Sequence, residues 1–309
     1  VRPFMMIDDG WQVSHVRGYY NGGPWSRSND QFVSMQRTAE QIHATGCRAG
    51  IWMRPLLTMS HVPSEAVYDS HAQKTGIVLD PSHPFSKEKI AEDIRRIRGW
   101  GYELIKHDFT CYDLFGEELC GEMPEHFYDR TKTNAQILRE LYALIQEAAG
   151  EDALILGCNT VGHLVAGIHP LQRIGNDTSG RSFEWTRRYG IHSMMRMVQN
   201  KIFYIADPDC AAFTGQVSEK LNFEFLNAAA MTGAAVFASV TPGILQMAGE
   251  QRLHDIFQTA CSVRPDAGAV ITDWLYTAVP SGFSFRGKEY RYNWYEEYRG
   301  ARHDLTWLA

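Results

Sequence analysis

Short apolar runs alternate with amphipathic stretches along most of the chain. The runs have the length of buried strands, and most end at Gly, Pro or a polar residue. Several stretches between them repeat apolar residues every three or four positions, as helices with one buried face do. Counted with the polar residues that close them, eight runs predict strands: residues 3–8, 47–53, 76–81, 104–108, 153–160, 172–180, 201–209 and 234–239.

This alternation predicts an α/β protein with a (β/α)8 TIM barrel over residues 1–265. The alternative is an open doubly wound sheet, which needs a glycine-rich phosphate loop after its first strand. Residues 8–11, Asp-Asp-Gly-Trp, are no such loop. Residues 266–309 differ, because Gly and Pro break their apolar residues into short segments. They predict the start of a C-terminal antiparallel β domain.

Composition narrows the possible partners. The 309 residues carry a net charge of −6 and no basic block, so we expect no nucleic acid partner. No uninterrupted apolar run is long enough to span a membrane, so we expect no membrane partner. The six cysteines include no Cys-x-x-Cys pair, and reduced thiols favour the cytoplasm. Fourteen Tyr and eight Trp agree weakly with a sugar ligand. A homo-oligomer remains open.

The residues 103–110 concentrate candidate chemistry. Lys106 and Asp108 have the same parity, so in a strand their side chains point the same way. They follow apolar residues and stand at the carboxyl end of the strand, where barrel enzymes place their active sites. We hypothesise that Asp108 is a nucleophile and that Lys106 helps to keep it ionised. The alternative is a structural ion pair.

Other predicted strands also end in acids. The strand-end acids are Asp8, Asp9, Asp80, Asp108, Asp177, Asp207 and Asp209. Glycoside hydrolysis needs two carboxyl groups, one ionised and one that donates a proton. Asp108 and Asp177 end the fourth and sixth strands, and Arg173 could orient Asp177. No His-x-His motif follows the first strand, and His107 is expected to be a packed residue. We expect no metal and no cofactor, although a hard-cation site built from carboxylates remains possible.

Six motifs in this order resemble the α-galactosidase clan of glycoside hydrolases, families 36 and 27, and family 36-like sequences most. They cover roughly residues 3–250. The motifs are Asp8-Asp9-Gly10-Trp11, Gly50-Ile51-Trp52, Lys106-His107-Asp108, Gly157-Cys158-Asn159, Arg173-Ile174-Gly175-Asn176-Asp177 and Asp207-Pro208-Asp209. The sequence departs from the family at His107, where Trp or Tyr is usual, and at Thr110, where Asn is frequent.

The resemblance implies a retaining glycosidase that cleaves terminal α-D-galactosides of an oligosaccharide or glycoconjugate by double displacement. Asp108 matches the nucleophile and Asp177 the general acid/base. The residues implied in substrate binding are Asp8, Asp9, Trp11, Trp25, Trp52, Lys106, Cys158, Asn159 and Arg173. Two alternatives stay open: a related enzyme that transfers the galactosyl group to another sugar, and a non-catalytic sugar-binding barrel.

Overall fold

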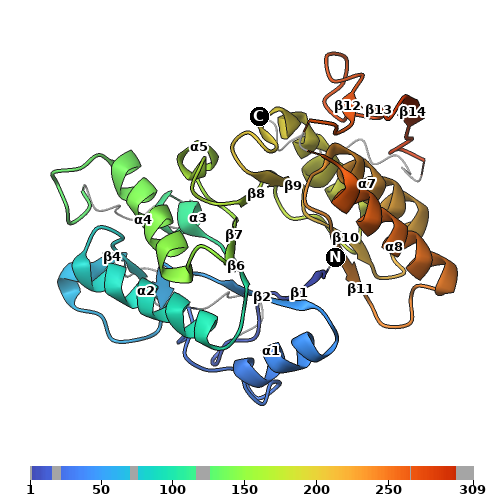
Figure 1. Cartoon of the computed structure of the whole chain (residues 1–309). Helices are drawn as coiled ribbons and strands as arrows, with labels where there is room; N and C mark the ends of the chain where they lie inside the picture. Colours follow the sequence, from blue (N-terminus) through green and yellow to red (C-terminus); the bar gives the residue numbers. More distant parts are fainter. Residues whose placement is uncertain (1, 16–21, 70–75, 116–125, 265, 297–309) are drawn as a thin grey trace. The chain divides into compact units, whose positions relative to one another are not determined.

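The computed structural model describes residues 2–15, 22–69, 76–115, 126–264 and 266–296. The chain forms two compact units, residues 1–172 and 173–309 (Figure 1). The predicted boundary between residues 265 and 266 stays a prediction.

Unit 1 is built on a parallel sheet. Its strands are β1 (Phe4–Ile7), β2 (Arg48–Met53), β6 (Leu104–His107), β7 (Leu154–Gly157) and the start of β8 (Leu171–Arg173). The register places Ile7, Ile51, Ile105 and Ile155 opposite one another on successive strands. The carboxyl ends of β2, β6 and β7 therefore lie level at one edge, where the predicted site residues follow them.

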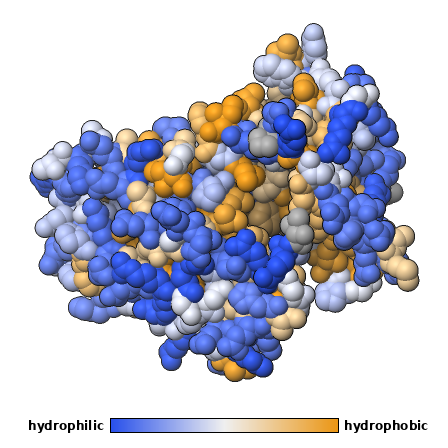
Figure 2. Space-filling view, viewed as in Figure 1, coloured by the Kyte–Doolittle hydropathy of each residue, from blue (hydrophilic) through white to orange (hydrophobic). Residues whose placement is uncertain are grey.

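Helices follow these strands and bury the faces that the apolar spacing predicts. They are α1 (Met35–Ala44), α2 (Pro84–Gly99) and α4 (Asn134–Ala149), with the short α3 (Thr110–Phe115) and α5 (Gly162–Val165). On α2 the apolar face of Ile90, Ile94 and Ile97 is buried, and the helix packs against α4 (Figure 1). The outward sides of α2 and α4 carry the hydrophilic residues seen in Figure 2. Helix α4 begins at a capping box, in which Thr133 and Gln136 bond each other's backbone.

The prediction that residues 76–81 form a parallel strand of the barrel was wrong. Residues 76–81 contain β5 (Ile77–Leu79), but β5 pairs antiparallel with β3 (Leu57–Thr58) and β4 (Val67–Asp69), and β2 pairs directly with β6. An apolar run specifies burial and not the direction of its partner. The segment 57–69 supplies β3, β4 and the turn η1 (Ser64–Ala66).

Unit 2 contains a parallel pair, a helical layer and an antiparallel sheet. Strand β9 (Ile205–Asp207) precedes β10 (Cys210–Phe213), which pairs in parallel with β11 (Phe237–Val240). The helices are α7 (Glu219–Thr232) and α8 (Met247–Ser262). The short helix α6 (Phe183–Trp185) is continued by a π-helix, η4 (Thr186–Ile191), and a 3-10 helix, η5 (His192–Gln199).

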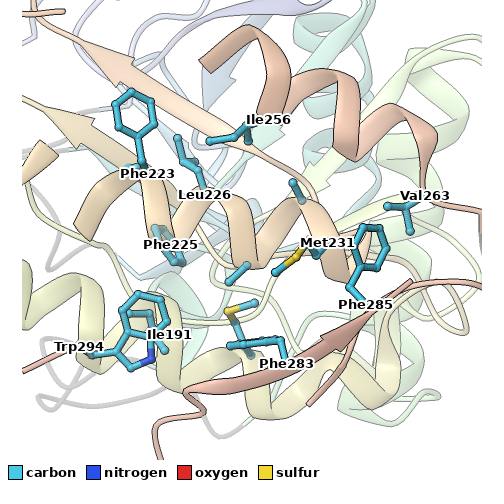
Figure 3. Packing of buried hydrophobic residues seen from close by; sticks show 14 of the residues in the cluster. Ile191, Phe223, Phe225, Leu226, Met231, Ile256, Val263, Phe283, Phe285 and Trp294 are labelled. Carbon is cyan, nitrogen blue, oxygen red and sulfur yellow. The ribbon is translucent and has the colours of Figure 1, made fainter. Parts of the chain in front are cut away.

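The predicted C-terminal antiparallel β structure is confirmed. Strands β12 (Val270–Ile271), β13 (Gly282–Phe285) and β14 (Lys288–Arg291) form one sheet. Phe283 and Phe285 join Met231 of α7 and Ile256 of α8 in one hydrophobic cluster (Figure 3). This sheet therefore contributes to the core of unit 2.

Candidate active site

Asp108 follows β6 and is held by two N–H donors. Its own backbone N–H donates to the carbonyl oxygen of Met53, 2.9 Å away, which extends the pairing of β6 with β2. The indole Nε1 of Trp52 donates to Asp108 Oδ2 at 3.1 Å, and the backbone N of Phe109 donates to Oδ1 at 2.7 Å. Donors on both oxygens fix the orientation of the carboxylate.

Lys106 pairs with the first strand-end acid. Its Nζ lies 3.0 Å from Asp8 Oδ2 and 3.2 Å from Oδ1. The Lys106 side chain is 7% exposed and that of Asp8 is 55% exposed, so the buried cation supports a carboxylate that solvent can reach. Asp9 accepts a bond from Gln12 Nε2 at 2.9 Å, and burial raises the pKa of Asp9.

The three tryptophans implied in sugar binding lie inside unit 1. Trp11, Trp25 and Trp52 have exposed fractions of 0%, 1% and 1%. Their rings contact each other in sequence, with centroids 5.8 Å apart for Trp11 and Trp25 and 5.9 Å for Trp25 and Trp52. Trp11 Nε1 also donates to the Trp52 carbonyl at 2.8 Å. Nε1 of Trp11 and of Trp25 bonds a backbone carbonyl, whereas Nε1 of Trp52 bonds Asp108, a predicted catalytic carboxylate.

Cys158 and Asn159 follow β7. Cys158 is buried, and its backbone N donates to the His107 carbonyl at 2.9 Å. Asn159 is exposed and has a positive φ of 50°. Its Oδ1 accepts a 2.7 Å bond from the backbone N of Tyr112, which satisfies a donor in the first turn of α3. Asn159 therefore connects the end of β7 to the helix that follows Asp108.

His107 is a packed residue, as expected. It is fully buried, and its Nε2 lies 3.5 Å from His169 Nδ1. His169 Nε2 lies 3.2 Å from the Tyr142 carbonyl, an acceptor, so that nitrogen carries the proton and Nδ1 receives one from His107. Burial and the neighbouring His169 lower the pKa of His107, and burial lowers the pKa of His169 to about 4. Both rings are therefore neutral near pH 7.

In unit 2, Arg173 holds three carboxylates. Its guanidinium contacts Asp177 Oδ1 at 2.9 Å, Asp207 Oδ2 at 3.1 Å and Asp209 Oδ1 at 2.6 Å. The side chains of Arg173, Asp207 and Asp209 are buried, whereas that of Asp177 is 80% exposed. Burial raises the pKa of Asp207, and Arg173 opposes this shift. Arg173 thus contacts Asp177, and its role in orienting that acid stays a prediction.

Sequence reasoning noted Asp207 and Asp209 but did not connect them to Arg173. The sequence signal that could have connected them is that both acids lie at the end of the next strand along the chain, β9. Because the Ile174 N–H donates to the Asp207 carbonyl at 2.9 Å, the end of β8 lies beside the end of β9. Asp209 also accepts a 2.7 Å bond from the backbone N of Thr178, directly after Asp177.

Three strand ends share an uncommon backbone conformation. Phe109, Asn159 and Asp209 have φ values of 66°, 50° and 74°, and they follow β6, β7 and β9 within two residues. Side chains other than glycine seldom adopt this left-handed region, and the conformation is frequent at functional sites. The three positions therefore indicate where candidate site residues lie, at the carboxyl ends of β6 and β7 in unit 1 and of β9 in unit 2.

Comparison with solved structures gives the same class of fold. No family model matches the sequence. The α-galactosidase of Thermus thermophilus, solved with p-nitrophenyl α-D-galactopyranoside, superposes with a TM-score of 0.65 at 21% identity, over 94% of this chain and 60% of that one. The α-galactosidase of Saccharomyces cerevisiae gives 0.53 at 11% identity, over 84% and 55%. The isomalto-dextranase of Arthrobacter globiformis, complexed with panose, gives 0.59 at 15% identity, over 91% and 54%.

The chain thus shares its fold with these α-galactosidases, as its motifs indicated. It spans 60% or less of the length of these three proteins. Within the part of the chain that the structure describes, no helix is long and apolar enough to cross a membrane.

Proposed function

We propose that this chain is the catalytic part of a retaining glycosidase that removes terminal α-D-galactose from an oligosaccharide or glycoconjugate. The observation that carries the proposal is the Asp108 carboxylate, which stands at the end of a parallel strand with an N–H donor on each oxygen. The shared fold with α-galactosidases supports the sugar class. We also propose that the parallel strands belong to one closed (β/α)8 barrel.

In the first step, Asp108 attacks the anomeric carbon while Asp177 gives a proton to the leaving oxygen. The bond from the sugar to its leaving group breaks, and a bond from Asp108 to the sugar forms. In the second step Asp177 takes a proton from water, which displaces Asp108. The donors from Trp52 and Phe109 aim the carboxylate during attack and stabilise it again when it leaves.

The position of Asp177 suits the proposed general acid/base. Its side chain is 80% exposed, so a bound sugar can reach it, and the contact of Oδ1 with Arg173 can orient it. Asp8, paired with Lys106, and Asp9 supply oxygens that can accept bonds from sugar hydroxyls. The remaining assigned residues, Trp11, Trp25, Cys158 and Asn159, would hold this arrangement in place.

The cysteines Cys47, Cys111, Cys158, Cys210 and Cys261 are free thiols. Free thiols are typical of reducing compartments, which supports our proposal of a cytoplasmic enzyme.

The test is hydrolysis of p-nitrophenyl α-D-galactopyranoside by the intact chain and by Asp108→Asn. The variant should lose several orders of magnitude in kcat, because the amide cannot act as the nucleophile. Asp255→Asn, an exposed acid on α8, is the matched control and should keep full activity. Normal turnover by Asp108→Asn would refute the assignment.

Further measurements define the stereochemistry of the reaction, its acceptor and its substrate. Proton NMR of the first product should show α-galactose, since double displacement retains configuration; β-galactose would refute it. An added acceptor sugar separates transfer from hydrolysis. Because the isomalto-dextranase shares the fold, an α-glucoside is tested beside the galactoside. Galactose binding without turnover of either substrate would favour the non-catalytic alternative.

A further inference from the structure

The buried ion pair of Arg54 and Asp113 contacts Phe109, the residue after Asp108, and takes no part in the proposed chemistry. Arg54 directly follows β2, and Asp113 lies on α3. Arg54 Nε lies 3.0 Å from Asp113 Oδ1 and 3.1 Å from Oδ2, and Nη2 also donates to Oδ1. Their side chains are 5% and 1% exposed. A buried ion pair is seldom required for stability, since an apolar pair of similar volume often serves as well.

The Arg54 guanidinium also fixes the ring of Phe109. Its central carbon lies 4.3 Å from the Phe109 ring centroid. The Phe109 carbonyl accepts a 2.7 Å bond from the backbone N of Asp113, the backbone bond that opens α3. Trp52 adds an edge contact, with ring centroids 6.3 Å apart. The ion pair therefore holds the ring of Phe109, and the helix that carries Asp113 holds its carbonyl.

Phe109 needs this support because its backbone is in the left-handed region, with φ of 66°. The conformation directs its N–H to Asp108 Oδ1, 2.7 Å away. Because φ is the rotation between the peptide plane that carries this N–H and the helix that follows, a relaxed Phe109 with negative φ and α3 in place would turn the N–H away from the carboxylate.

We propose that Arg54 and Asp113 are positioning residues for the nucleophile: their ion pair holds Phe109 in the left-handed conformation that orients the Asp108 carboxylate. This inference rests on the proposed function for its catalytic consequence, but its structural part does not. It separates these two residues from the sugar-binding set, because they act through Phe109 and not on the substrate.

The test replaces the pair by apolar residues in the double variant Arg54→Met/Asp113→Leu, which leaves no unpaired buried charge. Far-UV circular dichroism and Tm verify folding. We expect kcat on the aryl galactoside to fall about 100-fold, the scale of a small misplacement of a reacting group. KM should change little, because the sugar-binding residues are untouched. A folded double variant with kcat within about twofold of the wild type would overturn the proposal.

One added variant and one control variant test whether the ion pair acts through Phe109. Phe109→Gly, introduced into the double variant, should recover part of kcat, because glycine adopts positive φ without a supporting ring; no recovery would place the action of the pair elsewhere and overturn the proposal. The matched control is Arg48→Met/Glu103→Leu at the opposite ends of β2 and β6. Arg48 bonds Glu103 at 2.9 Å and stacks over Phe4 at 4.4 Å, and kcat should be unchanged there.

A readout without turnover keeps the inference distinct from the proposed function. In protein labelled with ¹⁵N-phenylalanine, the Phe109 amide proton bonded to a carboxylate should resonate downfield and return upfield in the double variant. That shift in a wild type that hydrolyses no glycoside would support the positioning role and refute the activity. An amide signal identical in both proteins would overturn the positioning role, whatever the activity.

Discussion

Replacing Arg173 by methionine should destabilise unit 2 strongly at neutral pH. The substitution leaves Asp207 and Asp209 buried without their shared cation. Removing one partner of a buried ion pair costs about 3–5 kcal/mol. The contact with the exposed Asp177 adds about 0–1 kcal/mol, because water screens it. Since domains are stable by roughly 5–15 kcal/mol, this loss is a large fraction of the total.

The effect should depend on pH with a defined sign. Burial already raises the pKa of Asp207 above its ordinary value of 3.8, and Arg173 counteracts this. Without Arg173, the carboxyl holds its proton to higher pH, and a protonated Asp207 needs no cation. The loss in free energy of unfolding is therefore full at pH 7 and shrinks as the pH falls towards 3.8.

Urea unfolding of the wild type and Arg173→Met at pH 7 and pH 5 measures both quantities. Asp177→Asn is the control and should cost less than about 1 kcal/mol. Adding Asp207→Asn to Arg173→Met should recover part of the loss. Equal stability of Arg173→Met and the wild type at pH 7, or a difference that grows on acidification, would refute the reasoning.

Three other substitutions test separate features. Trp52→Phe keeps a ring but removes the donor to Asp108, so kcat/KM should fall about 10–100-fold, the value of a bond to a charged group; a change under twofold, with Tm preserved, would contradict this. His169, whose pKa burial lowers to about 4, contributes stability that is present above pH 6.5 and is lost as the pH falls towards 4, by about 3 kcal/mol. His169→Gln should flatten that part of the curve of urea midpoint against pH, and an unchanged slope would argue against a neutral buried ring. At Gly175 a Cβ would lie 2.2 Å from the Tyr189 carbonyl oxygen, so Gly175→Ala should lower stability by about 1–3 kcal/mol in calorimetry, whereas an unchanged Tm would show that the helix yields.

The strand and helix pattern was predictable where local burial decides it. The predicted strands at 3–8, 47–53 and 104–108 contain β1, β2 and β6, and the predicted inward residues of α2 are buried. The run at 76–81 was also a strand, but its partners were not those expected. Periodicity contains no information on pairing direction, because antiparallel and parallel strands can bury the same residues.

The candidate site was predictable in its members and less so in their contacts. The carboxyl ends of parallel strands meet at one edge, so the acids that follow them could be named from the sequence. The expectation that Lys106 assists Asp108 stays a prediction, and the structure adds an ion pair between Lys106 and Asp8. It also missed Arg54 and Asp113, since a pair 59 residues apart has no local signal.

The sequence by itself determined the order of strands and helices, the buried faces, the capping of α4 and the identity of the strand-end carboxylates. These features depend on residues close together in the chain, whose spacing fixes burial and backbone bonds. Only the tertiary structure decided that Arg173 serves three carboxylates, that Trp52 donates to Asp108 and that Phe109 keeps a positive φ between Arg54 and α3. Hydrogen bonds and ion pairs act over a few ångströms, so they form only where folding brings distant segments together.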